Sequence, residues 1–365
     1  MPGDSIADPK KEHQQWCSFS LSIIEMSQKA LKIRENYHLY EIFFVSLHRN
    51  ITGTMNIETF NQDPNFSIVM PGGCNADCAF CFNKDKRTVR MGDRMTWLLN
   101  LYRTLVALPD QFYQISITGN EPMMSPIIDD VLSICREVRG KYTNILLTTN
   151  GTNLTNGLHN VVKSVDHINV SRHHYDEEEN CKIFRGSYRV MDEDLAEIID
   201  TYSAQGVDVS LNCVINDETT YDFINAYIDF AKRMGAHAVR FRKQNGDNLN
   251  MTPAEEVFDQ RYPVIERGEC PVCRTWKRVI RGMETYWKAA VIEPTDKVKD
   301  KVYELVYNTD GNLYLDWDFK IPYQLKFPTR DGLKRRVVAH ECGQSMIRDC
   351  GRSYSSCGGS SRSHC

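Results

Sequence analysis

The 365-residue sequence contains no long hydrophobic run, no excess of positive charge and no internal repeat. Its most apolar short stretch, YEIFFVSL at residues 40–47, is far shorter than the roughly 20 residues of a membrane-spanning helix. Its first residues show no positive region followed by an apolar run, so no secretory signal is visible. A formal net charge of −4 argues against nucleic acid as a partner. These features predict a cytoplasmic protein without membrane contacts.

Cysteine, in contrast, is abundant, with thirteen residues. A reducing compartment keeps thiols free, so several of these cysteines are candidate metal ligands rather than disulfide partners. Three of them, Cys74, Cys78 and Cys81, lie in the stretch MPGGCNADCAFCFNK at residues 70–84. A structural zinc site would use four ligands, whereas a [4Fe–4S] cluster held by three thiolates keeps one iron open to an outside ligand. On spacing alone, a cluster, zinc and a chance grouping all stay open.

Short β-rich runs alternate with longer amphipathic stretches between residues 65 and 243. This alternation predicts βαβ units and a parallel α/β sheet, either doubly wound or curved into a β/α barrel. In both architectures, functional sites form at the C-terminal ends of the strands. The predicted strands are residues 65–70, 112–118, 144–149, 167–171, 207–214 and 237–242, and the predicted helices are residues 93–107, 125–139, 157–163, 190–204 and 221–234.

The segment CNADCAFC resembles the C-x₃-C-x-Φ-C signature of the radical S-adenosylmethionine (SAM) superfamily, with Phe80 at the aromatic position. The resemblance implies that Cys74, Cys78 and Cys81 hold a [4Fe–4S] cluster whose open iron binds SAM. In that family, an electron from the cluster cleaves SAM to a 5′-deoxyadenosyl radical, which takes a hydrogen atom from the substrate. The cofactors supply this chemistry, and the protein supplies placement and shielding.

Residues after the later predicted strands extend the resemblance. The motif TGNEP resembles the family's GGEP motif, with Asn120 in place of the second glycine, and implies that Glu121 completes a site for the SAM amino group. TTNGT, which contains Asn150, is another recurrent pattern of the family, although an Asn-Gly turn alone is common. Ser171 and Arg172 stand where members hold the SAM ribose or carboxylate, although a solvated salt bridge would equally explain the arginine.

Two further strands add weaker signals. Asn212 resembles a position that contacts SAM in relatives, and the backbone around Phe241 is expected to meet the adenine. His173 and His174 either face the substrate or are surface and capping residues. No side chain is assigned a catalytic role beyond the cluster and SAM. The SAM-binding residues implied by the resemblance are Phe80, Gly119, Asn120, Glu121, Asn150, Ser171, Arg172 and Asn212.

The resemblance covers residues 65–243 and implies a partial (β/α)₆ TIM-like barrel. The predicted organisation is therefore a mostly helical segment at residues 1–64, the barrel at 65–243 and a cysteine-bearing extension at 244–365. Within the extension, residues 303–318 predict a hairpin, since Asp310-Gly311 is a strong turn signal. The Gly/Ser-rich tail is too polar to build a core of its own.

A second set of cysteines lies in that extension. Cys270 and Cys273 form a C-x₂-C pair, and two of Cys342, Cys350 and Cys357 would complete a four-ligand auxiliary [4Fe–4S] site. Zinc at the same thiolates, a redox-active tail and inert cysteines are the alternatives.

The function expected from these features is radical SAM chemistry that oxidatively modifies a peptide, with flavodoxin or ferredoxin as electron donor. Modification of a small molecule such as a nucleotide or sugar is the second reading. A non-catalytic iron–sulfur redox sensor is the third, and it would not explain the motifs at the strand ends.

Overall fold

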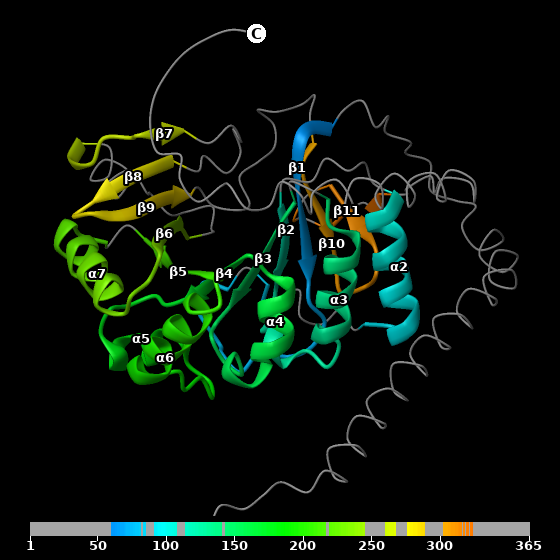
Figure 1. Cartoon of the computed structure of the whole chain (residues 1–365), viewed down its shortest axis with the longest axis horizontal. Helices are drawn as coiled ribbons and strands as arrows, with labels where there is room; N and C mark the ends of the chain where they lie inside the picture. The colour runs from blue at the N-terminus through cyan, green and yellow to red at the C-terminus, as the bar shows by residue number, and fades with distance from the viewer. Residues whose placement is uncertain are drawn as a thin grey trace, which may run out of the picture. The chain divides into compact units, whose positions relative to one another are not determined.

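The computed structural model describes residues 60–81, 83–84, 91–107, 114–140, 143–216, 219–244, 260–267, 276–288, 302–315, 317, 319–320 and 322–323. Within these residues, one twelve-stranded sheet has the order β12-β11-β10-β1-β2-β3-β4-β5-β6-β9-β8-β7 (Figure 1). The central strands β1 to β6 all run parallel to their neighbours. The α/β class predicted from the alternating pattern is thus confirmed.

The six central strands agree with the predicted strands to within a few residues, except at the start of the first. That strand begins at Phe60, inside the stretch predicted as a helical segment, and the rest of that segment lies outside the described residues. The strands are β1 (Phe60–Val69), β2 (Gln114–Thr118), β3 (Asn144–Thr149), β4 (His167–Ser171), β5 (Asp208–Ile215) and β6 (Ala238–Lys243).

The helices follow their strands as the apolar periodicity predicts, with one addition. A helix at Glu177–Phe184 was not predicted, because it is short and polar and buries only Asn180 and Phe184. Asp176 caps it by accepting a hydrogen bond from the Glu179 amide. The helical elements are α2 (Arg94–Ala107), η2 (Pro122–Met124), α3 (Ile128–Val138), η3 (Thr155–Gly157), α4 (Leu158–Ser164), α5 (Glu177–Phe184), α6 (Asp192–Ser203) and α7 (Tyr221–Arg233).

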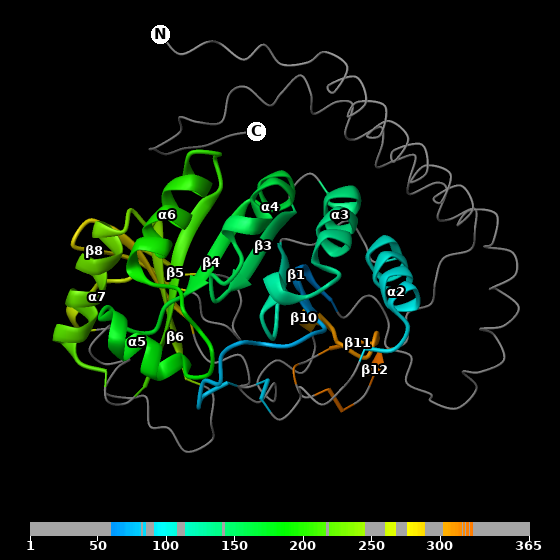
Figure 2. The same cartoon turned by 90° about the horizontal axis from the view of Figure 1, so that it is seen from below.

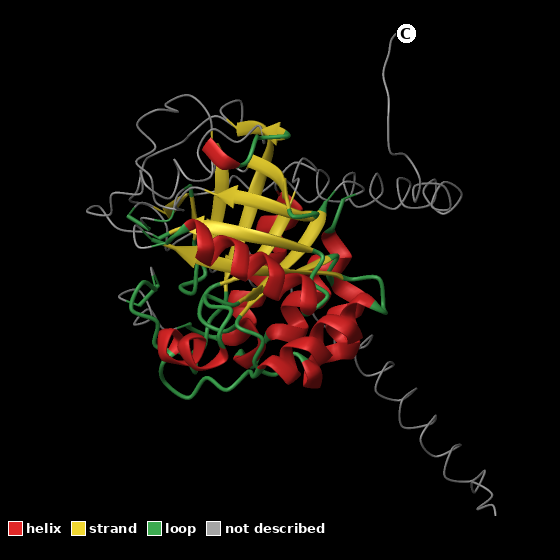
Figure 3. Ribbon diagram, turned by 90° about the vertical axis from the view of Figure 1, so that its left-hand side faces the viewer, coloured by secondary structure: helices red, strands yellow, loops and turns green. Residues whose placement is uncertain are grey.

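The two faces of the sheet differ in chemistry. Side chains of a strand alternate between faces, and the register of the parallel strands sets which residues share one face. Helices lie along one side of the sheet (Figures 2 and 3). The residues of the outer face pack in the main hydrophobic core and include Phe66, Ile68, Ile115, Ile117, Ile145, Leu147, Ile168, Val170, Val209, Leu211, Cys213, Val239 and Phe241. The residues between them form the inner face, which includes Ser67, Ser116, Thr148, Asn169, Ser171, Ser210, Asn212 and Arg240.

The chain beyond the barrel extends the sheet at both ends. The predicted hairpin is confirmed as β10 (Val302–Tyr307) and β11 (Leu313–Tyr314), with Gly311 at φ 80° in the turn. Unexpectedly, β10 also pairs in parallel with β1. At the other end, β9 pairs in parallel with β6, and a hairpin turn at Arg281-Gly282 joins it to β8. The remaining strands are β7 (Glu266–Arg267), β8 (Trp276–Ile280), β9 (Met283–Lys288) and β12 (Pro322–Tyr323).

Among the described residues, no helix is long and apolar enough to cross a membrane. The cysteines proposed for an auxiliary site, Cys270, Cys273, Cys342, Cys350 and Cys357, lie outside the described residues, so that site stays a prediction.

Candidate functional site

The loop that carries the three cysteines begins where β1 ends. The Met70 amide donates to the Thr118 carbonyl at 2.7 Å, which continues the β1–β2 pairing by one residue. Gly72 then adopts a φ of 129°, a conformation that side chains rarely allow. Cys74, Cys78 and Cys81 follow at the C-terminal edge of the sheet. Cys78 is buried, and Cys74 and Cys81 are half-buried.

The donor chemistry of this loop suits an iron–sulfur cluster. Thiolates are soft ligands that hold iron–sulfur clusters, and three of them lie within eight positions of one loop. Within the described part of the chain, no three His, Cys, Asp or Glu side chains converge closely enough to hold one metal ion. The donor set of the loop therefore fits a cluster.

The GNEP segment turns sharply beside this loop. Gly119 has a φ of 80°, and a Cβ atom there would lie 2.6 Å from Cγ1 of Val69. Asn120 has a φ of 50°, which asparagine tolerates better than most residues. Its side-chain amide donates to the Met70 carbonyl at 2.8 Å. Asn120 therefore takes a left-handed conformation that glycine adopts more readily, and its side chain makes a hydrogen bond that glycine could not make.

Glu121 is buried, with 1% of its surface exposed. One carboxylate oxygen accepts from the Met123 amide at 3.0 Å and from the Thr149 hydroxyl at 2.5 Å. The other oxygen accepts from the Asn150 amide at 2.7 Å. Burial raises the pKa of Glu121 to about 7, although these three donors favour the charged form. The carboxylate thus joins the ends of β2 and β3, and its contact with SAM stays a prediction.

Asn150 continues this network toward the cysteine loop. Its side-chain amide donates to Oδ1 of Asn75 at 2.8 Å, and its own Oδ1 accepts from the Thr152 amide at 2.9 Å. Asn75 in turn donates to the Thr152 hydroxyl at 2.9 Å. Hydrogen bonds therefore run without interruption from Glu121 to the residue that follows Cys74. The TTNGT motif is built into this network and is more than a simple turn.

The side chains of Ser171, the last residue of β4, and of Arg172, which follows it, point to opposite faces of the sheet. Ser171 pairs in register with Asn212 of β5, so both lie on the inner face. The Arg172 guanidinium is instead 1% exposed, 2.5 Å from Asp192 at the start of α6 and 5.1 Å from the ring centre of Phe230 in α7. Ser171 and Asn212 thus lie together, at the strand ends where SAM contacts were expected. The arginine lies among the helices, so its implied SAM contact has no support in this arrangement.

His173 forms part of the wall around the cysteine loop. Its Nδ1 accepts from the Val214 amide at 3.1 Å, and its ring stacks on Phe184 with centres 4.8 Å apart. The ring of Phe80, the aromatic residue of the cysteine motif, lies nearly perpendicular to the same imidazole, with ring centres 4.9 Å apart. Burial, followed by the charge of Arg172, lowers the pKa of His173 to about 3. The imidazole is therefore neutral, and its Nδ1 acts as an acceptor.

His174 and Phe241, the remaining residues with predicted contacts, lie in different surroundings. The His174 ring packs against Tyr175 and Phe223, and its Nδ1 accepts from the Asp176 amide. Phe241 points to the outer face, which leaves only its backbone available to the expected adenine site. Sequence reasoning also missed the polar inner face as a whole. Polar residues at every second position of β4 and β5 were the available signal, because parallel strands covered on both sides are usually apolar throughout.

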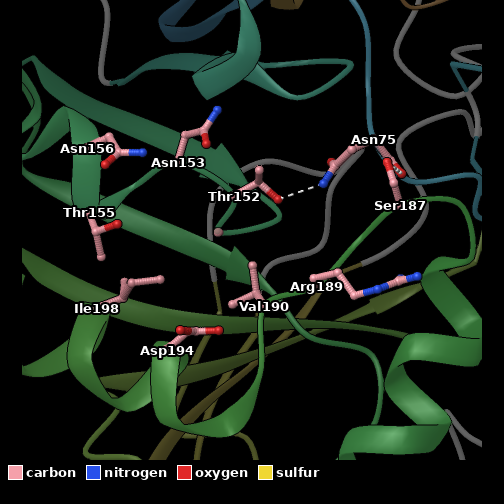
Figure 4. Close-up of a pocket in the computed structure, with 11 residues that line it drawn as sticks. Asn75, Thr152, Asn153, Thr155, Asn156, Ser187, Arg189, Val190, Asp194 and Ile198 are labelled. Carbon is pink, nitrogen blue, oxygen red and sulfur yellow. Dashed lines mark hydrogen bonds between the residues drawn. The ribbon is translucent and has the colours of Figure 1, made fainter.

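A polar pocket of about 230 Å³ lies next to the cysteine loop at Asn75 (Figure 4). Asn75 and Ser187 line one side of it, and the turn after β3 lines the other. Residues 184–187 thus reach the loop although no motif marks them in the sequence.

Known proteins share this combination of fold and motifs. Residues 68–231 match the family model described as the radical SAM superfamily. Residues 68–231 therefore form a radical SAM domain, and members of that superfamily bind SAM and a [4Fe–4S] cluster.

Particular relatives are distant. An S-adenosylmethionine-dependent nucleotide dehydratase from Lacinutrix mariniflava is 26% identical over 207 residues, which cover 54% of this chain but only 42% of that protein. The structure of Streptococcus suis SuiB bound to S-adenosylmethionine aligns with a TM-score of 0.50 and 15% identity, over 86% of this chain and 78% of that one. The structure of native anSMEcpe with bound AdoMet and the Cp18Cys peptide aligns with a TM-score of 0.48 and 13% identity, over 80% of this chain and 86% of that one. The likeness to SuiB shows a common fold, and the predicted partial barrel is confirmed.

Proposed function

We propose that this chain is a radical SAM enzyme in which Cys74, Cys78 and Cys81 hold the [4Fe–4S] cluster. The observation that carries this proposal is the placement of three cysteine side chains in one loop at the C-terminal edge of the sheet. That is the edge at which β/α folds bind their ligands. When bound, the cluster and SAM supply abstraction of a hydrogen atom from the substrate.

The chain's own residues bind and orient these groups. Ser171 and Asn212 lie side by side on the inner face and offer a hydroxyl and an amide to SAM. The turn at Gly119 and Asn120 presents backbone groups beside the cysteine loop. The Phe80 ring, packed on His173, shields one side of the loop from water. We assign Arg172 to supporting the start of α6, since its guanidinium is paired with Asp192.

We further propose that the substrate is a peptide, which is modified oxidatively. A second cluster in the extension would accept the second electron of such an oxidation, with Cys270 and Cys273 as its first ligands. SuiB, which shares the fold, has also been crystallised bound to its precursor peptide SuiA. A flavodoxin or ferredoxin would supply the first electron.

A nucleotide or another phosphorylated small molecule is the second candidate. The relative from Lacinutrix mariniflava is described as a nucleotide dehydratase. In this chain, Arg240 and Arg242 both lie on the inner face of β6, two residues apart. Guanidinium groups suit phosphate oxygens because they offer two parallel donors. This arrangement favours an anionic substrate at the β6 end of the inner face.

Iron and sulfide analysis with EPR tests the proposed chemistry. The protein is reconstituted without oxygen, reduced with dithionite and measured with and without SAM. We expect about eight irons per chain if both clusters form, and about four in a variant with Cys74, Cys78 and Cys81 all replaced by Ala. SAM should perturb the EPR signal of the wild type but not that of the triple variant. Cys181→Ala is the matched control, because this half-buried thiol lies in α5 outside the motif.

Two outcomes would revise the proposal. An EPR signal that does not respond to SAM would contradict the assignment of the cysteine loop. About four irons in wild type, unchanged in a Cys270→Ala/Cys273→Ala variant, would remove the auxiliary cluster. Stimulation of SAM cleavage by nucleoside triphosphates but not by peptides would replace the peptide with the second candidate.

A further inference from the structure

We propose that Asn75 is a positioning residue that holds the cysteine loop in one conformation before any cluster binds. This inference deepens the proposed function and rests on it, because the loop has this importance only if its thiols are ligands. Asn75 lies between Cys74 and Cys78 and is joined to two other segments of the chain. Asn75 occupies the first of the three unspecified positions between the first two cysteines of the C-x₃-C-x-Φ-C signature.

The side chain of Asn75 uses both of its polar ends. Its Oδ1 accepts from the side-chain Nδ2 of Asn150 at 2.8 Å, and its Nδ2 donates to the Thr152 hydroxyl at 2.9 Å. Figure 4 shows the second of these bonds, with the Asn75 side chain directed toward the turn after β3. Asn150 is itself held by Glu121, so this connection begins at a buried carboxylate.

The backbone of Asn75 is tied to the segment after α5. Its carbonyl accepts from the Ser187 amide at 2.8 Å and lies 3.4 Å from the Ser187 hydroxyl. A Cβ atom at Gly186 would lie only 2.5 Å from the same carbonyl, so the two backbones approach as closely as glycine permits. Two residues further on, the Asp77 amide donates to the Phe184 carbonyl at 2.7 Å.

These bonds fix the part of the loop between Cys74 and Cys78 to two other segments of the chain. The turn after β3 holds the Asn75 side chain, and the segment after α5 holds its backbone and that of Asp77. A site whose ligands are already in place loses less conformational entropy when the cofactor binds. The thiolate positions are therefore expected to depend on Asn75, although Asn75 offers no ligand of its own.

Amide hydrogen exchange on the cluster-free protein tests the loop directly. We compare wild type with Asn75→Ala and with Thr152→Val, which removes only the hydroxyl partner. Asn156→Ala is the control, because this exposed asparagine lines the same pocket. In Asn75→Ala, the amides of Asp77 and Ser187 should exchange about tenfold faster or more, since two hydrogen bonds are lost. Thr152→Val should show a smaller increase, and the control none.

Cluster retention and EPR then connect the loop to the cluster. In Asn75→Ala, a chelator should remove iron about tenfold faster than from wild type, which corresponds to about 1.4 kcal/mol. The shift that SAM causes in the EPR spectrum should broaden or disappear. The midpoint of urea unfolding should change little, which separates a local effect on the loop from general destabilisation.

The outcomes separate the two proposals. Unchanged exchange at Asp77 and Ser187 in Asn75→Ala would overturn the positioning role, whether or not the wild type binds a cluster. Faster exchange together with unchanged iron loss and an unchanged SAM effect would also overturn it. A wild type whose EPR spectrum ignores SAM would instead contradict the proposed function.

Discussion

Glu121 offers the sharpest test of the electrostatics of this site. In the folded chain, burial raises its pKa from 4.5 to about 7. Such a shift of a carboxyl group stabilises the folded state fully below pH 4.5, and this stabilisation is lost as the pH rises through about 7. At about 1.4 kcal/mol for each pKa unit, the free energy of unfolding should fall by about 3 kcal/mol across this range because of Glu121 alone.

The perturbation is Glu121→Gln, which removes the titrating group. The amide can keep two of the three hydrogen bonds, so we expect a loss of about 1 kcal/mol at pH 5 and a gain relative to wild type at pH 8. Urea unfolding followed by circular dichroism at half-unit steps of pH measures the difference. Glu197→Gln, on an exposed position of α6, is the control for general charge effects.

A difference between wild type and Glu121→Gln that stays flat from pH 5 to pH 8 would refute this reasoning. If the stability of the wild type relative to Glu121→Gln rose with pH, the three hydrogen-bond donors would outweigh burial in setting the pKa of Glu121. The same group also tests the predicted SAM contact. If the SAM ammonium lies beside Glu121, binding at pH 7 should release a proton, because a nearby positive charge lowers the pKa of a carboxyl group. Calorimetry in buffers with different heats of ionisation would detect that release.

Two further substitutions separate backbone and side-chain roles. Gly119→Ala should destabilise the fold by about 2–3 kcal/mol in urea unfolding, because of its positive φ and the 2.6 Å approach to Val69. Gly206→Ala, at φ 79° with open space around it, should cost only about 1 kcal/mol, and equal losses would show that the contact with Val69 is relieved. Arg172→Met should lower the free energy of unfolding by about 1–2 kcal/mol, because Asp192 loses its buried partner but keeps 35% of its side chain in contact with water. An unchanged stability with weaker SAM binding would instead restore the arginine to the SAM site.

The central part of the fold could be predicted from the sequence because it depends on local patterns. Each strand and helix between residues 65 and 243 carries its own apolar periodicity, and the parallel order follows from the connections. The position of β10 beside β1 could not be predicted in this way. Pairing between distant segments depends on side chains such as Ser67, which donates to Glu304 at 2.6 Å, and no local pattern records that choice.

The site was predictable in position but not in orientation. The motifs located the strand ends correctly, but a motif does not state which face of the sheet a side chain occupies. Ser171 and Arg172 are neighbours in the sequence and point to opposite faces, as the two-residue period of a strand requires. Counting outward from the apolar residues of β4 would have separated them. The hydrogen bonds between the cysteine loop and residues 184–187 leave no comparable pattern in the sequence, because they are made largely by backbone groups.

The pairing of β10 with β1 has a consequence for folding on the ribosome. Ser67 and Glu304 are 237 residues apart, so at about 5–20 residues per second one edge of β1 waits roughly 12–47 s for its partner. Throughout that interval, the first strand of the barrel offers an unpaired edge to other chains. The edge of β1 is therefore covered only by β10, which is made after all of β1 to β6. During this interval, chaperones can bind the edge of β1 beside the cysteine loop.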